Sequence, residues 1–202
     1  MIFDEIIKQT SGIIAGIISM IAYLPYFYSI IKGKTKPSRS SWWIWSLVGF
    51  IILVSYYDLG ARNTIWIPIV FFICPLAIAF LSIKYGANKG LKKLDLVSII
   101  LSIISLTLWG FFRLPILTLT VNIFVDFLGF LPTFQKSYQK PTEENRMTWI
   151  LFFLGSILNL IALEEFSISI ALYPIYMFFM DLVMIFLLFR RVTKTSKIQY
   201  AG

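Results

Sequence analysis

The sequence contains no histidine, and it contains a single cysteine, Cys74. An intrachain disulfide is therefore impossible, and a metal centre built from cysteine and histidine ligands is excluded as well. Charged residues are also scarce, because only 14% of the chain is Asp, Glu, Lys or Arg while 58% is hydrophobic. Ordinary soluble domains carry roughly 25% charged residues. The composition excludes a typical soluble domain and indicates an integral membrane protein.

The motifs of common catalytic sites are missing too. The chain has no imidazole base, no glycine-rich phosphate loop and no nucleophile elbow. Asp126 and Asp181 form an acid pair within apolar segments, but they lack the glycine flanks expected of an intramembrane protease. We therefore expect no enzyme, no cofactor and no bound metal.

Seven apolar segments are long enough to approach or cross a bilayer. They are residues 10–31, 42–59, 64–84, 94–112, 114–136, 147–163 and 167–189. The apolar runs are continuous and do not alternate with period two, which favours helices over barrel strands. The flank of the first segment is mixed in charge, which favours a retained helix over a signal peptide. The sequence thus predicts an all-α integral membrane protein with seven transmembrane helices.

The net charge of +8 comes from basic residues that gather in alternate connections. Fifteen Lys and Arg fall on one side of the predicted bundle, whereas only Lys8, Arg62 and Arg113 fall on the other. By the positive-inside rule the N-terminus is outside and the C-terminus is cytoplasmic. We expect a multipass protein of a prokaryotic inner (plasma) membrane, with the lipid bilayer as a partner and no nucleic acid.

The two halves of the chain resemble each other. Residues 22–27 (AYLPYF) match residues 129–134 (GFLPTF) at an offset of 107, and a second match at an offset of 106 begins at Pro68 and Pro174. We expect a first three-helix repeat over 1–90, a linker helix over 91–113, a second repeat over 114–191 and a tail over 192–202. The linker supplies an extra crossing, so the two repeats are parallel.

This three-one-three arrangement, the outside N-terminus and the Leu-Pro of the first and fifth helices resemble the SWEET and PQ-loop transporter superfamily. The literal Pro-Gln of that family is absent, because Tyr26 follows Pro25 and Thr133 follows Pro132. The resemblance implies a carrier that moves a small polar solute, such as a sugar or an amino acid, by alternating access. A vitamin or nucleoside facilitator of the nicotinamide riboside type and a non-transporting receptor or scaffold remain alternatives. The sequence leaves the oligomeric state open, a homo-oligomer included.

Two acids lie near the middle of predicted spans, Asp126 in 114–136 and Asp181 in 167–189. Ionisable groups inside a bilayer are costly, and they mostly face the bundle interior or a water-filled path. Asp126 also belongs to a polar stripe on one helical face, formed by Thr118, Asn122, Asp126, Gly129 and Thr133. We expect Asn122, Asp126 and Asp181 to bind the solute or to couple protons to its transport. For Asp181, a structural hydrogen bond is an equally good interpretation.

Asn159 and Trp45 complete the predicted substrate site. An amide such as Asn159 suits a polyol or an amide ligand, and an interhelical hydrogen bond is at least as good an interpretation. Trp45 belongs to a group of three tryptophans that first of all indicates an interfacial belt. As an alternative, Trp45 shares an inward face with Gly49 and Ile52.

Two prolines within the predicted helices are candidates for hinges. Pro25 and Pro132 each remove a backbone hydrogen bond, so they are candidate hinges of two gating helices. A static kink that only shapes the packing is the competing interpretation. Tyr26, next to the first proline, is a candidate for a cytoplasmic gate.

Overall fold

The structure, a computed structural model, describes residues 2–33, 37, 39–86, 93–139, 141 and 144–190, apart from a few side chains within these ranges. Regular structure in this part of the chain is helical, which confirms the all-α prediction. A short 3₁₀ helix, η1 (Asn63–Ile65), leads directly into the third α-helix. The α-helices are α1 (Ile2–Ile31), α2 (Arg39–Asp58), α3 (Trp66–Tyr85), α4 (Lys93–Gly110), α5 (Pro115–Gln139), α6 (Arg146–Ile161) and α7 (Ile168–Phe189).

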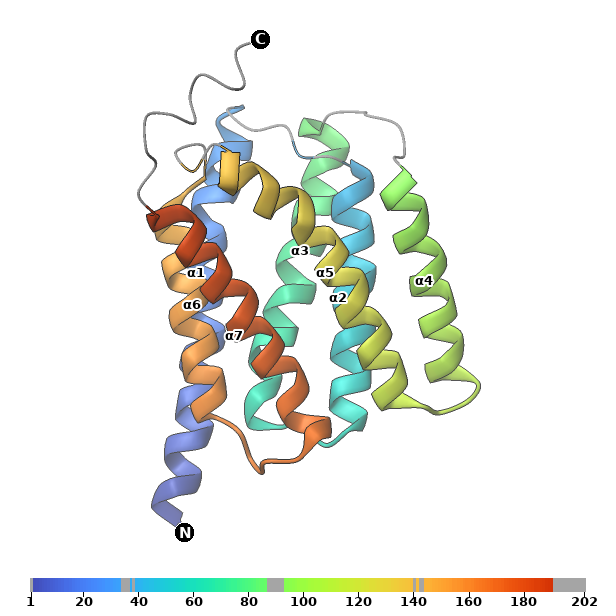
Figure 1. The fold of residues 1–202 in the computed structure, drawn as a ribbon, viewed down its shortest axis with the longest axis vertical. Helices are drawn as coiled ribbons and strands as arrows, with labels where there is room; N and C mark the ends of the chain where they lie inside the picture. Colours follow the sequence, from blue (N-terminus) through green and yellow to red (C-terminus); the bar gives the residue numbers. More distant parts are fainter. Residues whose placement is uncertain are drawn as a thin grey trace.

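Each α-helix coincides with one of the predicted apolar segments, and α1 differs most from its prediction. Its first residue is Ile2, well before the predicted start at residue 10. Asp4 and Glu5 lie in its first turn, where negative charge interacts favourably with the helix dipole. The N-terminal end of α1 projects beyond the other helices (Figure 1).

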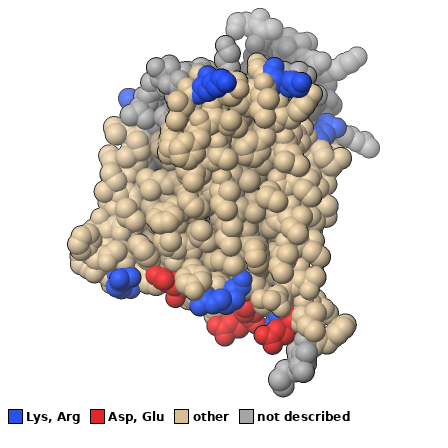
Figure 2. Space-filling view, turned by 180° about the vertical axis from the view of Figure 1, so that it is seen from behind, with Lys and Arg blue, Asp and Glu red and all other residues tan. Residues whose placement is uncertain are grey.

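Three helical stretches are long and apolar enough to cross a membrane, namely Phe3–Ile31, Asn63–Tyr85 and Ile168–Phe189. Four further apolar stretches are shorter, so the full set of seven spans stays a prediction. On the face shown in Figure 2, the described charged residues lie toward the two ends of the molecule and leave a broad uncharged band between them. This distribution is what a membrane-embedded belt requires.

Consecutive helices run in opposite directions (Figure 1). We call the end where α1, α3, α5 and α7 finish the basic pole, after the predicted distribution of Lys and Arg. The other end, where Lys8, Arg62 and Arg113 lie, is called the opposite pole. Helix α1 packs against α3 and α6, α2 packs against α3 and α5, and α7 packs against α5 and α6. Helix α4 makes its larger contacts with α5 and α2 only. It therefore lies at the edge of the bundle (Figure 1).

Candidate functional site

A cavity of about 700 Å³ lies inside the bundle. Its described lining residues come from α1, α2, α3, α5, α6 and α7 and from the α5–α6 connection. It reaches Ser29, Trp42 and Asn145 near the basic pole, and it extends inward to Ile52 and Tyr173. Cavities of roughly 300–1,000 Å³ are typical of small-molecule sites. The cavity is therefore large enough for a solute of the size of a sugar, an amino acid or a nucleoside.

Corresponding positions of the two halves line this one cavity. Six pairs of lining residues are separated by 106 or 107 positions: Ala22 and Gly129, Tyr23 and Phe130, Tyr26 and Thr133, Trp42 and Trp149, Trp45 and Phe152, and Pro75 and Asp181. Most pairs conserve size or aromatic character, whereas the last pair sets a proline against an acid. The two halves thus contribute corresponding positions to the wall, and the carboxyl groups among the described lining residues all come from the second half.

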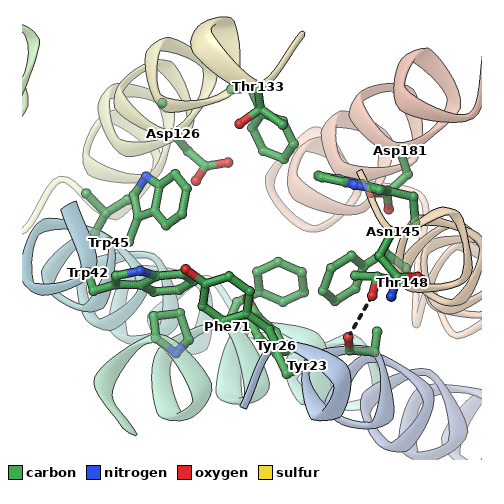
Figure 3. A pocket seen from close by; sticks show the side chains of 18 of the residues that line it. Tyr23, Tyr26, Trp42, Trp45, Phe71, Asp126, Thr133, Asn145, Thr148 and Asp181 are labelled. Carbon is green, nitrogen blue, oxygen red and sulfur yellow. Dashed lines mark hydrogen bonds between the residues drawn. The ribbon is translucent and has the colours of Figure 1, made fainter. Parts of the chain in front are cut away.

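Both predicted acids lie at the cavity wall. Asp126 of α5 accepts a hydrogen bond from the hydroxyl of Tyr176, at 2.8 Å between Oη and Oδ2. Asp181 of α7 is only 2% exposed, and Ser156 of α6 lies beside its carboxyl group. Figure 3 shows the two carboxyl groups on their separate helices, with aromatic side chains between and around them. The cavity therefore brings together two acids that are 55 residues apart in the chain.

The electrostatic character of the cavity is acidic. Asp126, Asp181 and Glu144 line it, and no Lys or Arg is among its described lining residues. Glu144 lies in the α5–α6 connection, where its Oε2 accepts from the indole Nε1 of Trp149 at 3.5 Å. Charges in a low-dielectric interior act over longer distances than they do in water. The arrangement favours a cation or a group rich in hydrogen-bond donors.

Aromatic rings make up much of the remaining wall. Tyr26 contacts Trp42 at 5.2 Å between ring centroids, and Trp42 contacts Trp45 at 5.1 Å. Tyr23, also of α1, contacts Phe71 and Phe152 at 5.7 and 5.2 Å. These separations are those of attractive edge and tilted ring pairs. A bound solute would meet ring faces and edges in addition to carboxylates.

The three tryptophans at the start of α2 do not share one environment. Trp42 and Trp45 line the cavity, together with Gly49 and Ile52. Trp43 is 41% exposed and packs on Phe80 of α3, at 5.2 Å between centroids. The inward-facing interpretation therefore fits Trp45, and the interfacial belt fits Trp43.

Asn122 lies away from the cavity, in the contact between α4 and α5. Its amide nitrogen donates to the hydroxyl oxygen of Ser105 and, at 2.9 Å, to the carbonyl oxygen of Thr118. Ser105 also donates to the Thr118 carbonyl, at 3.2 Å. The polar stripe of α5 therefore has two neighbours: its first half faces α4, and its second half, from Asp126 onward, faces the cavity. The expected grouping of Asn122 with the two acids does not occur.

Asn159 is also absent from the cavity wall. It is fully buried in α6, and neither its amide nitrogen nor its amide oxygen has a hydrogen-bond partner among the described residues. It lies one helical turn beyond Gly155, where an added Cβ would come within 2.7 Å of the Ser19 hydroxyl of α1. The side chain thus belongs to a close helix contact and does not form the expected interhelical hydrogen bond there.

Two of the predicted gating residues, Pro25 and Tyr26, line the cavity. Helix α1 is continuous through Pro25. The side chain of Pro132 lies outside the described residues, although its position falls within α5. The hinge role of both prolines stays a prediction, as does the gate role of Tyr26.

Several wall residues escaped the sequence interpretation. Trp149 and Phe152 could have been found, because they lie 107 residues after Trp42 and Trp45 in the internal match. Glu144 carried no signal, since it lies in a polar connection outside the apolar segments. Tyr176 is not among the described lining residues of the cavity, and its contact with Asp126 could not be predicted because their helices meet only in the folded bundle.

No family model, curated protein or solved structure matches this chain. Within the described part of the chain, no three Cys, Asp or Glu side chains gather where they could hold a metal ion. The functional interpretation therefore depends on the cavity itself.

Proposed function

We propose that this chain is a membrane carrier that moves a small polar solute by alternating access. The observation that supports it is a cavity to which both α1–α3 and α5–α7 contribute lining residues, with the carboxyl groups of Asp126 and Asp181 at its wall. Carriers commonly bind their solute near the middle of the membrane, between two structural repeats. The resemblance to the SWEET and PQ-loop superfamily leads to the same proposal.

In this proposal the structure corresponds to the state that is open toward the basic pole. The cavity extends to Ser29 and Asn145 at that end, and at its other end it stops at Ile52 and Tyr173. Rocking of the α1–α3 unit against the α5–α7 unit would close the first end and open the second. Because both units contribute lining residues to the cavity, a change in their relative angle alters access from both ends at once.

The wall chemistry defines the class of solute that we propose. Asp126 and Asp181 accept hydrogen bonds or neutralise a positive charge, and the surrounding rings attract cations and flat groups. The proposed solute is a small molecule with several donors or one positive charge. Protons are the proposed coupling ions, since a carboxyl group that loses its solute partner can bind a proton instead.

A second candidate is a facilitator for a vitamin or a nucleoside. The aromatic lining favours it, because Tyr26, Trp42 and Trp45 form a continuous run of rings on which a flat heterocycle can stack. Sugars and aliphatic amino acids use such stacking less fully. The two candidates share the cavity and differ in the solute.

The test is uptake by the purified protein in proteoliposomes, after a thermal-shift screen of sugars, amino acids, vitamins and nucleosides. We expect Asp126→Asn and Asp181→Asn to lower the uptake of the selected solute at least about tenfold, or to abolish its dependence on a pH gradient. The matched control is Asp58→Asn, because Asp58 lies outside the cavity and accepts from Trp109 at 2.6 Å. Specific binding without uptake would replace the carrier by a receptor. Uptake that neither cavity variant changes would show that the site is wrong.

A further inference from the structure

The connection between α6 and α7 reaches across the opposite pole to the connection between α2 and α3. One carboxylate makes this contact. Glu164 Oε1 accepts from the backbone nitrogen of Arg62 at 2.6 Å, from that of Asn63, and from that of Thr64 at 3.2 Å. Its second oxygen, Oε2, accepts from the Thr64 hydroxyl, also at 3.2 Å. The contact joins residues about one hundred positions apart.

These hydrogen bonds have a clear physical role. The first N–H groups of a helix lack partners within the helix, and a negative charge there interacts favourably with the helix dipole. Arg62, the residue before η1, provides no side-chain cap of its own. Glu164 therefore caps the η1–α3 segment from the other half of the molecule. Hydrogen bonds to a charged acceptor are about twice as strong as those between neutral groups.

A second layer of contacts lies between Glu164 and the cavity. Tyr56 is fully buried, and its hydroxyl donates to the carbonyl oxygen of Ile170 at 2.6 Å and lies 2.9 Å from Thr64 Oγ1. Its ring contacts the ring of Tyr173 at 5.6 Å between centroids. Tyr173 is itself part of the cavity wall. The layer thus again links the α1–α3 half to the start of α7, directly below the cap.

Helix α1 closes the same junction from a third side. A Cβ atom on Gly12 would lie 1.9 Å from the carbonyl oxygen of Asn63, and one on Gly16 would lie 2.8 Å from Trp66 Cβ. The Lys8 ammonium donates to the backbone oxygen of Glu164 at 3.0 Å. The backbones are therefore in direct contact around the Glu164 cap, and little space is left for a solute.

We propose that Glu164 is the latch that keeps the opposite pole closed while the cavity is open toward the basic pole. The inference rests on the proposed alternating access. It adds the contact that is made in one of the two states and broken in the other. Opening this pole would withdraw the carboxylate from the N–H groups of residues 62–64 and break the contact of Tyr56 with Ile170. The two states then differ by a defined set of hydrogen bonds between the halves.

The test measures how accessible the cavity is from the opposite pole. A single cysteine is placed at Ile52, a buried wall residue one helical turn from Tyr56, on a Cys74→Ala background. A membrane-impermeant maleimide is then added to intact cells or to inverted vesicles, so that each pole is probed separately. We expect Glu164→Ala to raise the labelling rate from the opposite pole about tenfold or more, and to lower it from the basic pole.

Glu164→Gln keeps one acceptor oxygen without the charge, so we expect a smaller rise in the same direction. Asp58→Asn removes a carboxylate at the same pole without touching the cap, and it should label at the original rate. An unchanged rate in Glu164→Ala, with an unchanged melting temperature, would overturn the latch. If Glu164→Ala does not fold, the rate in Glu164→Gln decides by the same criterion.

The labelling experiment requires no solute, so it separates the two proposals. A shift in accessibility without uptake of any solute would refute the carrier and support the latch. Solute uptake with no effect of Glu164 on accessibility would refute the latch and support the carrier.

Discussion

Replacement of Gly129 by alanine gives the most direct test of the cavity as the solute site. Gly129 lies in the cavity wall opposite the indole of Trp45. An added Cβ would lie 2.7 Å from Trp45 Nε1 and 3.4 Å from its Cε2. Favourable contacts between heavy atoms lie at roughly 3.5–4.0 Å. The indole must therefore move by about 1 Å, and the open side of the ring is the cavity.

The size of the effect follows from this displacement. Overpacking in a filled core costs about 1–3 kcal/mol, and the lower end applies here because Trp45 can move into the cavity. A destabilisation of about 1 kcal/mol lowers the melting temperature by roughly 2–4 °C in a protein of this size. Solute binding should suffer more, because the moved ring occupies space that the solute needs. We expect uptake to fall about tenfold, which corresponds to about 1.4 kcal/mol.

Proteoliposome uptake and melting temperature are measured for Gly129→Ala, for Gly110→Ala and for Gly129→Ala combined with Trp45→Phe. Gly110 has open space where its Cβ would lie, so its replacement should leave uptake unchanged. The smaller phenyl ring should recover a substantial part of the lost uptake. Uptake at the original level in folded Gly129→Ala would refute the assignment of the cavity. A loss that Trp45→Phe does not reverse would refute the displaced indole as its cause.

Two further predictions concern buried amides outside the cavity. Asn122→Ala should destabilise the protein by about 1–3 kcal/mol, because it removes two buried hydrogen bonds, to the Ser105 hydroxyl and to the Thr118 carbonyl, and each contributes about 0.5–1.5 kcal/mol. A melting temperature equal to that of the original protein would contradict the role of these bonds at the contact between α4 and α5. Asn159→Leu should leave the melting temperature unchanged or raise it, because an apolar side chain of similar shape replaces an amide that has no hydrogen-bond partner among the described residues. A marked loss of stability in Asn159→Leu would mean that the amide has a partner in the folded protein.

The helices were predictable because each depends on a local property of the sequence. Continuous apolar runs predict helices in a membrane-like chain, and all seven segments are helical in the structure. The start of α1 was missed because the residues before Ser11 are partly polar, while helix formation also depends on first-turn charge. The two acids of the cavity were predictable from their cost in an apolar segment.

The composition of the site was only partly predictable. Asn122 and Asp126 share one face of α5. Helical periodicity predicts that they share this face, and it does not predict what the face contacts. The neighbour of each turn of this face depends on how α4 packs. Helix α4 covers the face at Asn122, and the face reaches the cavity only from Asp126 onward. Helical spacing therefore could not distinguish a wall residue from a residue in a helix contact.

By itself, the sequence determined the helical class, the approximate ends of the helices other than the start of α1, the match between its two halves at an offset of 106 or 107 residues, and the positions of Asp126 and Asp181 within apolar segments. These features follow from composition and from spacing along one segment. Only the tertiary structure decided that Asp126 and Asp181 share a cavity, that Asn122 and Asn159 do not, and that Glu164 caps a helix of the other half. Such contacts join residues that are distant in the chain, and they form only when packing fixes the position and rotation of every helix.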